Sequence, residues 1–257
     1  MACILLDVDG VLHVSGVAIP GAQDAVAALR DAGHALRFVT NNSTRPRAQL
    51  TEELCGMGFD LAEDELQTPA RAAARELRGK RVFALVMSGV VPDLDGLELV
   101  GEGAEAVLVG GCDETVEPNQ VFRYMNLARA FAEIQLGAEL YCLHKNRWWQ
   151  TSRGPLLDAG AFVAGLEYAT GVDAIVLGKP SPAYFAAALE ALAAEPERTW
   201  LVGDDVESDV RAAQLFGMKT AFVRTGKFRP DTLEGLDVTP DVVLSSIADL
   251  PAWLESR

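Results

Sequence analysis

Four groups of polar side chains each follow directly after a short apolar run of the sequence. They are Asp7 with Asp9, Thr40 with Asn41, Lys179, and Asp204 with Asp205 and Asp209. Carboxylates brought together repel each other and a phosphate dianion unless a cation lies between them, and Mg²⁺ prefers such oxygen ligands. The types of side chain therefore indicate chemistry on a phosphoryl group, with Mg²⁺ as the cofactor.

The order of these residues suggests a role for each in phosphoryl transfer. Asp7 is the candidate nucleophile, because it occupies the last position of the first apolar run and a carboxylate is ionised at neutral pH. Asp9 would protonate the leaving oxygen and then activate the water that cleaves the aspartyl-phosphate. The Thr40 hydroxyl and the Asn41 N–H would bind the phosphoryl oxygens, and Lys179 would neutralise the developing charge.

Each group taken alone also has a purely structural explanation. An Asp-x-Asp-Gly sequence is common in turns, and residues 40–46 form a good helix-capping sequence. Residues 178–180 could be a strand-to-helix turn with a solvated lysine, and the acidic residues after position 203 could favour a helix N-terminus. The occurrence of all four groups in this order, each after an apolar run, favours the catalytic interpretation.

The elements that must position these residues follow from the hydrophobic pattern. Short apolar runs alternate with longer amphipathic segments, which is typical of an α/β fold with a parallel sheet flanked by helices. The expected strands of the main series include residues 3–6, 36–39, 174–177, 200–202 and 220–223. Because the carboxyl ends of parallel strands meet at one edge of a sheet, the four groups can converge although they lie far apart in sequence.

A second alternation of strands and helices occupies residues 80–173 and carries none of the four groups. We therefore expect a core of residues 1–79 and 174–257, with an inserted α/β cap of residues 80–173. Five residues of the cap could recognise charge or stack on a ring of the substrate: His144, Lys145, Arg147, Trp148 and Trp149. A strand end with a tryptophan in the cap core and exposed basic neighbours would also explain them.

The composition limits the partners of the protein. Its 257 residues are 49% hydrophobic, and 22 basic against 37 acidic residues give a net charge of −15. This charge repels a phosphate backbone and an anionic membrane surface, so neither nucleic acid nor a membrane is an expected partner. No apolar stretch approaches the roughly 18 residues of a membrane span, and no signal-peptide pattern is visible. We expect a small phosphorylated substrate, a cytoplasmic location, and a monomer or homodimer.

The order of the motifs resembles the haloacid dehalogenase superfamily over nearly the whole chain. The segments that carry the resemblance are Asp7-Val-Asp9-Gly10-Val11-Leu12, Thr40-Asn41-Asn42, Gly178-Lys179-Pro180, and Gly203-Asp204-Asp205 with Asp209. The long insertion between the second and third motifs is similar to the type-IIA capped branch. The resemblance implies a Rossmann-like, doubly wound core and Mg²⁺ held by Asp7, the Asp9 backbone carbonyl and Asp204. It also implies that Asp205 and Asp209 lie behind the metal and orient it or its waters.

Three further stretches, residues 144–149, 164–171 and 223–228, resemble one subgroup of that branch. The subgroup implies hydrolysis of pyrophosphate or a phosphoramidate at the same site as an alternative to hydrolysis of a phosphomonoester. The intact Asp9 favours the monoester, because some members of the subgroup have a serine there. A metal-independent dehalogenase would also use Asp7, whereas a non-catalytic binding protein would have little reason to keep the four groups together.

Overall fold

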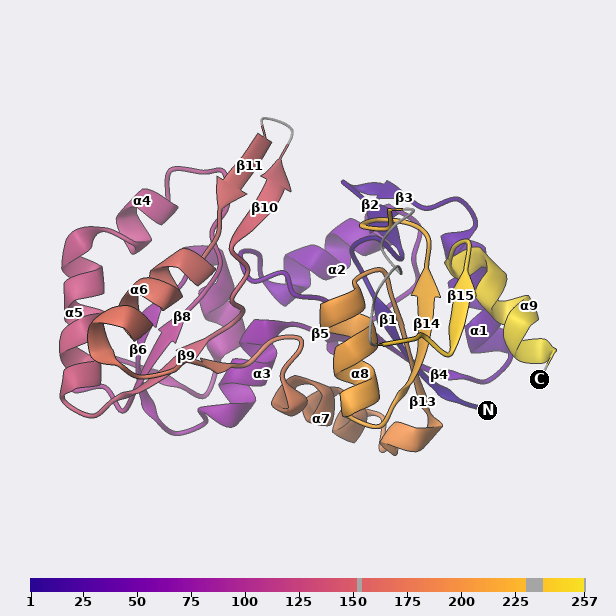
Figure 1. The fold of residues 1–257 in the computed structure, drawn as a ribbon. Coiled ribbons are helices and arrows are strands. Elements are labelled where there is room, and N and C mark those ends of the chain that lie inside the picture. The colour runs from indigo at the N-terminus through magenta and orange to yellow at the C-terminus, as the bar shows by residue number, and fades with distance from the viewer. Residues whose placement is uncertain (152–153, 230–237, 257) are drawn as a thin grey trace. The chain divides into compact units, whose positions relative to one another are not determined.

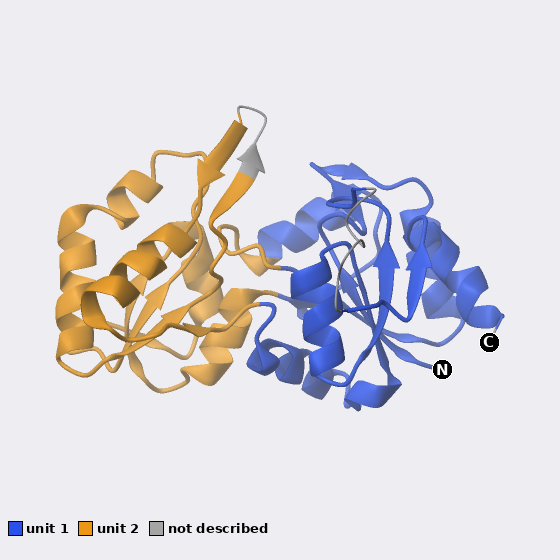
Figure 2. Cartoon of the chain, in the orientation of Figure 1, with its two compact units in different colours: residues 1–40, 48–67, 179–257 blue, residues 41–47, 68–178 orange. Residues whose placement is uncertain are grey.

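The computed structural model describes residues 1–151, 154–229 and 238–256 of the chain (Figure 1). The chain divides into two compact units, which Figure 2 shows in two colours. Unit 1 comprises residues 1–40, 48–67 and 179–257, and unit 2 comprises residues 41–47 and 68–178. The chain therefore passes between the units at four points of the sequence.

The described part of unit 1 contains a six-stranded parallel sheet in the order β15-β14-β13-β1-β4-β5 (Figure 1). The strands are β1 (Cys3–Asp7), β4 (Ala35–Val39), β5 (Leu66–Gln67), β13 (Thr199–Gly203), β14 (Lys219–Val223) and β15 (Val242–Leu244). From β1 the chain continues to β4 and β5 on one side, whereas β13, β14 and β15 are added on the other side. The strand order therefore reverses between β1 and β13, which is where doubly wound sheets bind ligands.

Helices cover the sheet of unit 1. They are α1 (Ala22–Asp31), α2 (Arg47–Gly56), α7 (Pro182–Ala191), α8 (Ala212–Leu215) and α9 (Leu250–Glu255), with a π-helical segment at Val206–Arg211 and 3₁₀ turns at Glu63–Glu65, Pro196–Arg198 and Ile247–Asp249. Val26 of α1 and Leu250 of α9 belong to the same buried cluster as Ile4 and Leu6 of β1, so both helices pack on one face of the sheet. A short antiparallel hairpin of β2 (His13–Val14) and β3 (Val17–Ala18) follows β1.

Unit 2 has a parallel sheet of its own, with five described strands in the order β12-β9-β8-β6-β7. Its elements are α3 (Pro69–Glu76), β6 (Arg81–Leu85), a 3₁₀ segment (Ser88–Leu94), β7 (Glu98–Leu99), β8 (Ala106–Val109), α4 (Pro118–Val121), α5 (Tyr124–Gln135), β9 (Glu139–Cys142), α6 (Gly160–Thr170) and β12 (Ile175–Val176). An antiparallel hairpin pairs β10 (Trp148–Thr151) with β11 (Gly154–Leu157). Alternate residues of β6 and β8 enter two different apolar clusters, one with α5 and α6 and the other with α3, so helices cover both faces of this sheet.

The predicted α/β fold class, with parallel sheets flanked by helices, is confirmed. One expected element of the core series has a different place, because the strand expected at residues 174–177 appears as β12, which pairs with β9 in the sheet of unit 2. An apolar run predicts a strand but does not identify the sheet that the strand joins. The expected domain boundaries near residues 79 and 173 stay a prediction, and the compact units change after residues 67 and 178. None of the described helices has both the length and the apolar character that a membrane span requires.

Candidate active site

A buried lysine joins two carboxylates in unit 1. Lys179 Nζ lies 2.8 Å from Asp7 Oδ1 and 2.7 Å from Asp209 Oδ1. The exposed fractions are 6% for Asp7, 3% for Lys179 and 1% for Asp209. Two carboxylates therefore share one ammonium group away from water, so one negative charge stays without a partner when both carboxylates are ionised.

A third carboxylate completes a buried acidic cluster. One carboxylate oxygen from each of Asp7, Asp204 and Asp209 lies within 4.8 Å of the other two. Oδ2 of Asp204 accepts a hydrogen bond of 2.7 Å from the Lys227 N–H, whereas Oδ1 is buried and has no donor among the described residues. A buried oxygen without a donor is unfavourable. The oxygen-only donor set and the unpaired Oδ1 both fit a divalent cation such as Mg²⁺.

Burial and neighbouring charges together set the protonation of this cluster. Burial raises the pKa of Asp7 well above its ordinary value, although the nearby Lys179 acts in the opposite direction. Burial and the neighbouring Asp209 raise the pKa of Asp204 to about 6. Burial would lower the pKa of Lys179, but the charges of Asp209 and Asp7 outweigh this effect and raise that pKa. A cation between the carboxylates would favour their ionised forms.

The strand order brings these residues together at one edge of the sheet. β13, β1 and β4 are neighbours in parallel register, and Asp204, Asp7 and Thr40 lie at or directly after their carboxyl ends. Gly10 lies against Asp204 with a φ of +82°, and a Cβ at this position would lie 2.1 Å from Asp204 Oδ2. The turn after β1 therefore requires glycine, because any side chain would displace the carboxylate.

Asp9 lies outside the buried cluster. Its side chain is 62% exposed, and the Thr40 hydroxyl donates to Asp9 Oδ2 over 3.3 Å. Nε2 of His13, in the hairpin that follows, lies 3.8 Å from Asp9 Oδ1. An exposed carboxyl two residues from Asp7 can exchange protons with a leaving group and with water, as general acid–base catalysis requires.

Thr40 is positioned by Tyr184, a contact that the sequence analysis missed. The Tyr184 hydroxyl accepts a hydrogen bond of 3.0 Å from the Thr40 N–H and lies 2.8 Å from the Thr40 carbonyl and 2.7 Å from the Gln67 carbonyl. Tyr184 is fully buried in α7, and these bonds fix the end of β4. No sequence signal separates this tyrosine from an ordinary aromatic residue of a helix core.

Asp205 has a structural role at the start of the π-helical segment. Its Oδ1 accepts hydrogen bonds of 2.9 Å from the N–H groups of Glu207 and Ser208, and its Oδ2 lies 2.7 Å from Lys227 Nζ. Burial raises the pKa of Asp205, but Lys227 and the two backbone donors outweigh it and lower the pKa to about 2. The Asp205 N–H also donates to Asp209 Oδ2 over 3.2 Å, which joins the start of the π-helical segment to the acidic cluster.

The remaining predicted site residues lie in unit 2. Asn41 is the first residue of the segment 41–47, so its predicted contact with phosphoryl oxygens stays a prediction. His144 is 4% exposed, and its Nε2 lies 2.7 Å from Ser43 Oγ within the same unit. Burial lowers the pKa of His144, and Asp158 partly counteracts this effect. The imidazole is therefore a buried group of unit 2 and has an internal partner.

The other four residues of the predicted cap cluster have different surroundings. Lys145 Nζ pairs with Glu167 at 2.8 Å, and Arg147 is exposed. Trp148 is 59% exposed in β10, while the indole N–H of Trp149 is buried without an acceptor in the described part of the chain. The role of this cluster in substrate choice stays a prediction.

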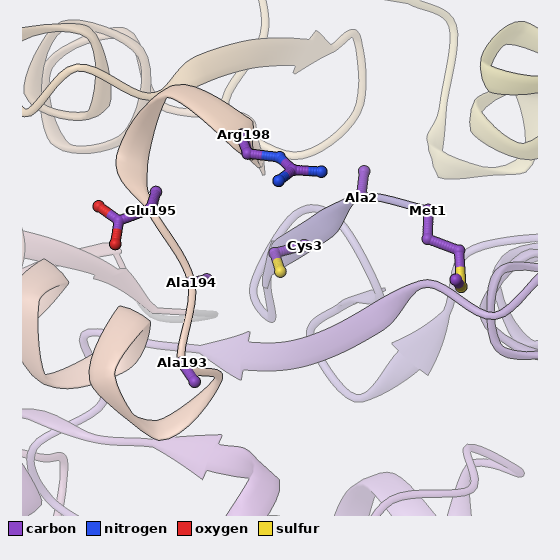
Figure 3. Close-up of a pocket in the computed structure, with 7 residues that line it drawn as sticks. All are labelled: Met1, Ala2, Cys3, Ala193, Ala194, Glu195 and Arg198. Atoms are coloured by element: carbon purple, nitrogen blue, oxygen red, sulfur yellow. The ribbon is translucent and has the colours of Figure 1, made fainter.

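A small cavity of about 140 Å³, whose lining residues are labelled in Figure 3, lies in unit 1 away from the acidic cluster. It is lined by Met1, Ala2, Cys3, Ala193, Ala194, Glu195 and Arg198. Cys3 begins β1 and Arg198 directly precedes β13, so the cavity is at the amino ends of the strands, whereas the predicted site residues follow the carboxyl ends. The cavity therefore does not belong to the candidate active site.

The sequence is similar to proteins of one known family. Residues 4–99 match the family described as haloacid dehalogenase-like hydrolase, and residues 176–250 match the family described as HAD-hydrolase-like. Phospholysine phosphohistidine inorganic pyrophosphate phosphatase of Xenopus laevis is 37% identical over 255 residues, which cover 95% of this chain and 91% of that protein. The chain belongs to the haloacid dehalogenase-like hydrolases.

Two further matches agree with this family of hydrolases. Human haloacid dehalogenase-like hydrolase domain-containing protein 2 is 37% identical over 248 residues, which cover 96% of this chain and 93% of that protein. The solved structure of p-nitrophenyl phosphatase from Archaeoglobus fulgidus is 29% identical with a TM-score of 0.89, and the match covers 98% of both chains. The predicted membership of this superfamily, on its type-IIA capped branch, is confirmed, as are the hydrolase activity and the Rossmann-like core.

Proposed function

We propose that this haloacid dehalogenase-like hydrolase is a Mg²⁺-dependent phosphatase that acts on a small phosphorylated metabolite through an aspartyl-phosphate on Asp7. The observation that carries the proposal is the buried cluster of Asp7, Asp204 and Asp209 around the single ammonium group of Lys179. The family relationship adds support, because the Xenopus laevis and Archaeoglobus fulgidus relatives described above are phosphatases by name.

In the first step, an oxygen of Asp7 attacks the phosphorus atom, and the bond from phosphorus to the leaving oxygen breaks. Oδ1 of Asp7 is engaged by Lys179 at 2.8 Å and by the Val8 N–H at 2.8 Å, which leaves Oδ2 for the attack. Asp9 donates its proton to the leaving oxygen, since its carboxyl group is exposed and therefore accessible to a bound substrate. With substrate bound, the Thr40 hydroxyl would donate to a phosphoryl oxygen in place of Asp9 Oδ2, which lies 3.3 Å from it, and Lys179 would balance the negative charge that develops on the phosphoryl oxygens.

In the second step, water attacks the phosphorus atom of the aspartyl-phosphate. Asp9, now ionised, accepts the proton of that water, and the bond between phosphorus and the Asp7 oxygen breaks. Inorganic phosphate leaves, and Asp7 returns as a carboxylate beside Lys179. The same two carboxyl groups thus serve both half-reactions.

The cation would be held by Asp7, the Asp9 backbone carbonyl and Asp204, with Asp209 and Asp205 behind it. The unpaired Oδ1 of Asp204 and the excess of buried carboxylates support this set. When bound, Mg²⁺ supplies positive charge that screens the carboxylates from the phosphate dianion and stabilises the charge of the transition state. Asn41 would add its N–H to the phosphoryl site.

Hydrolysis of pyrophosphate or of a phosphoramidate at this site is the second candidate function. It is favoured by the name of the Xenopus relative, which includes phospholysine, phosphohistidine and inorganic pyrophosphate. His144, Lys145, Arg147, Trp148 and Trp149 would select among these substrates. We also propose action in the cytoplasm as a monomer or homodimer.

The test is phosphate release from a panel of phosphomonoesters, pyrophosphate and phosphoramidates, with Mg²⁺ and then with excess chelator. We expect release that the chelator abolishes and that added Mg²⁺ restores. Release that is unaffected by the chelator would reject the role of the cation. Halide release from a haloacid without phosphate release would instead establish the dehalogenase.

A further inference from the structure

A tight turn after β14 contacts two of the proposed catalytic motifs within unit 1. It consists of Thr225, Gly226 and Lys227, and we call it the 225–227 turn. The backbone N–H of Lys227 donates to Asp204 Oδ2 over 2.7 Å, while Asp204 Oδ1 has no donor among the described residues. One oxygen of the carboxylate is thus fixed by the turn, and the other remains available to a cation.

The same turn also holds the loop that follows β1. The Thr225 hydroxyl donates a hydrogen bond to the Gly10 carbonyl. A Cβ on Gly226 would lie 2.0 Å from Asp204 Oδ2 and 2.6 Å from the Gly10 Cα. The turn is therefore in direct contact with both segments, and its backbone leaves no room for a side chain at position 226.

The side chain of Lys227 contributes differently from its backbone. Lys227 Nζ lies 2.7 Å from Asp205 Oδ2, but the lysine side chain is 68% exposed. An ion pair this open to water is screened and contributes little to stability. The buried hydrogen bond from the Lys227 N–H to Asp204 is the contact that can set the direction of the carboxylate.

We propose that the 225–227 turn is a positioning element for the cation: its backbone holds Asp204 so that Oδ1 faces the metal, and Gly226 is required for this contact. The inference rests on the proposed function, because it assumes a divalent cation at Asp7 and Asp204. It adds a role for Thr225, Gly226 and Lys227, which are not among the residues proposed to bind the phosphoryl group or the cation. Both the hydroxyl of Thr225 and the missing side chain of Gly226 contribute to the position of the turn.

The test is a calorimetric titration of the full-length protein with Mg²⁺ alone. We expect Gly226→Ala to weaken Mg²⁺ binding at least tenfold, because the added methyl group must displace either the turn or the Asp204 carboxylate. Gly217→Ala is the matched control at the other end of β14, since Gly217 also has a positive φ, +87°, but its Cβ would lie 3.7 Å from the nearest atom, in Pro196. Gly217→Ala should change the affinity less than threefold.

Two further variants separate the backbone from the side chains. Lys227→Met keeps the N–H donor and removes the ion pair with Asp205, so its Mg²⁺ affinity should stay within threefold of the wild type. Thr225→Val keeps the shape of the side chain and removes the hydrogen bond to Gly10, so it should weaken binding at least threefold. Thr225→Val also keeps the test decisive if Gly226→Ala fails to fold.

The outcomes distinguish this inference from the proposed function. A wild-type protein that binds no Mg²⁺ would reject the proposed function and the inference with it. Wild-type binding that Gly226→Ala and Thr225→Val both leave unchanged would reject the positioning role alone. Circular dichroism of each variant without Mg²⁺ serves as the reference. If the turn were purely structural, a variant would lose Mg²⁺ affinity only together with its metal-free fold.

Discussion

Asp7 is a carboxylate that the protein keeps almost completely away from water beside a single lysine. Burial raises its pKa well above the ordinary value, so the ionised form depends on nearby positive charge. Lys179 provides one such charge at 2.8 Å, but Asp209 shares it at 2.7 Å. The reactivity of Asp7 is therefore expected to depend on a second cation.

Replacement of Asp7 by asparagine tests the nucleophile directly. Asp7→Asn keeps the size of the side chain and the oxygen that accepts the Val8 N–H, and Lys179 keeps its partner Asp209. We expect a folded protein whose kcat is lower by at least about a thousandfold, as for loss of a covalent nucleophile. Phosphate release with saturating Mg²⁺ measures the change.

Asp31→Asn, at the exposed end of α1, is the matched control and should retain full activity. Near wild-type turnover by folded Asp7→Asn would exclude an aspartyl-phosphate at this residue. Circular dichroism of both variants establishes that the fold is unchanged.

Part of the site could be predicted from individual residues, and part could not. Asp7, Thr40 and Asp204 each follow a recognisable apolar strand, and parallel strands end at one edge, so their convergence was predictable. Tyr184 and Lys227 act through contacts that have no local pattern: Tyr184 bonds to Thr40 across 144 residues, and the Lys227 backbone bonds to Asp204 across 23. Such contacts depend on how helices and turns pack on the sheet.

At the scale of elements, the segment 41–47 is held within unit 2 by a buried polar contact. His144 Nδ1 accepts the Asn146 N–H at 3.3 Å, so the neutral imidazole carries its proton on Nε2 and donates it to Ser43 Oγ over 2.7 Å. A Cβ on Gly111 would lie 2.2 Å from that Oγ, so the backbone also packs closely against it. The contact links the short segment 41–47 to the end of β9.

Removal of the Ser43 hydroxyl should therefore destabilise unit 2. Ser43→Ala leaves the His144 Nε2–H buried without its acceptor, which costs about 1 to 3 kcal/mol. Ser88→Ala removes an exposed hydroxyl from the same unit and should change the free energy of unfolding by less than about 0.5 kcal/mol. Urea unfolding of both variants gives the comparison, and equal midpoints would contradict a stabilising role for the contact.

The bounds of the strands were predicted more reliably than the neighbouring strands with which they pair. The apolar runs indicated β1, β4, β13 and β14 within one or two residues of their observed bounds. The run at 174–177 was also a strand, but β12 pairs with β9 in unit 2. The sheet that a strand joins depends on which neighbouring strand has an unpaired edge where the two meet in the fold. Hydrophobic periodicity carries no information about that neighbour.

At the scale of the whole molecule, the net charge of −15 and the buried carboxylates make the protein sensitive to protons and divalent cations. Burial and Asp209 raise the pKa of Asp204 to about 6 in the metal-free protein. Because the folded state then holds this proton more tightly than the unfolded state, the contribution of Asp204 to stability is present at low pH and is lost as the pH rises through about 6. A cation bound at the proposed site would replace the proton above that pH.

Mg²⁺ should therefore stabilise the protein more at pH 7.5 than at pH 5. At a concentration 100 times its dissociation constant, a ligand adds about 2.7 kcal/mol, or roughly 5 to 10 °C for a chain of this size. At pH 5 the proton on Asp204 weakens the apparent affinity about tenfold, so the gain falls to about 1.4 kcal/mol. Thermal unfolding with and without Mg²⁺ at both pH values measures this, and an equal or larger shift at pH 5 would contradict it.

The four passages of the chain between the units affect how the protein can fold during its synthesis. β4 can pair with β1 early, but the other neighbour of β1 is β13, whose Thr199 pairs with Cys3. At 5 to 20 residues per second, a ribosome needs on the order of 10 to 40 s to make the roughly 200 residues between them. Unit 2 is fully synthesised at residue 178, so it can fold while one edge of β1 still has unpaired backbone N–H and C=O groups. We expect the nascent chain to need a chaperone on that edge until β13 has emerged.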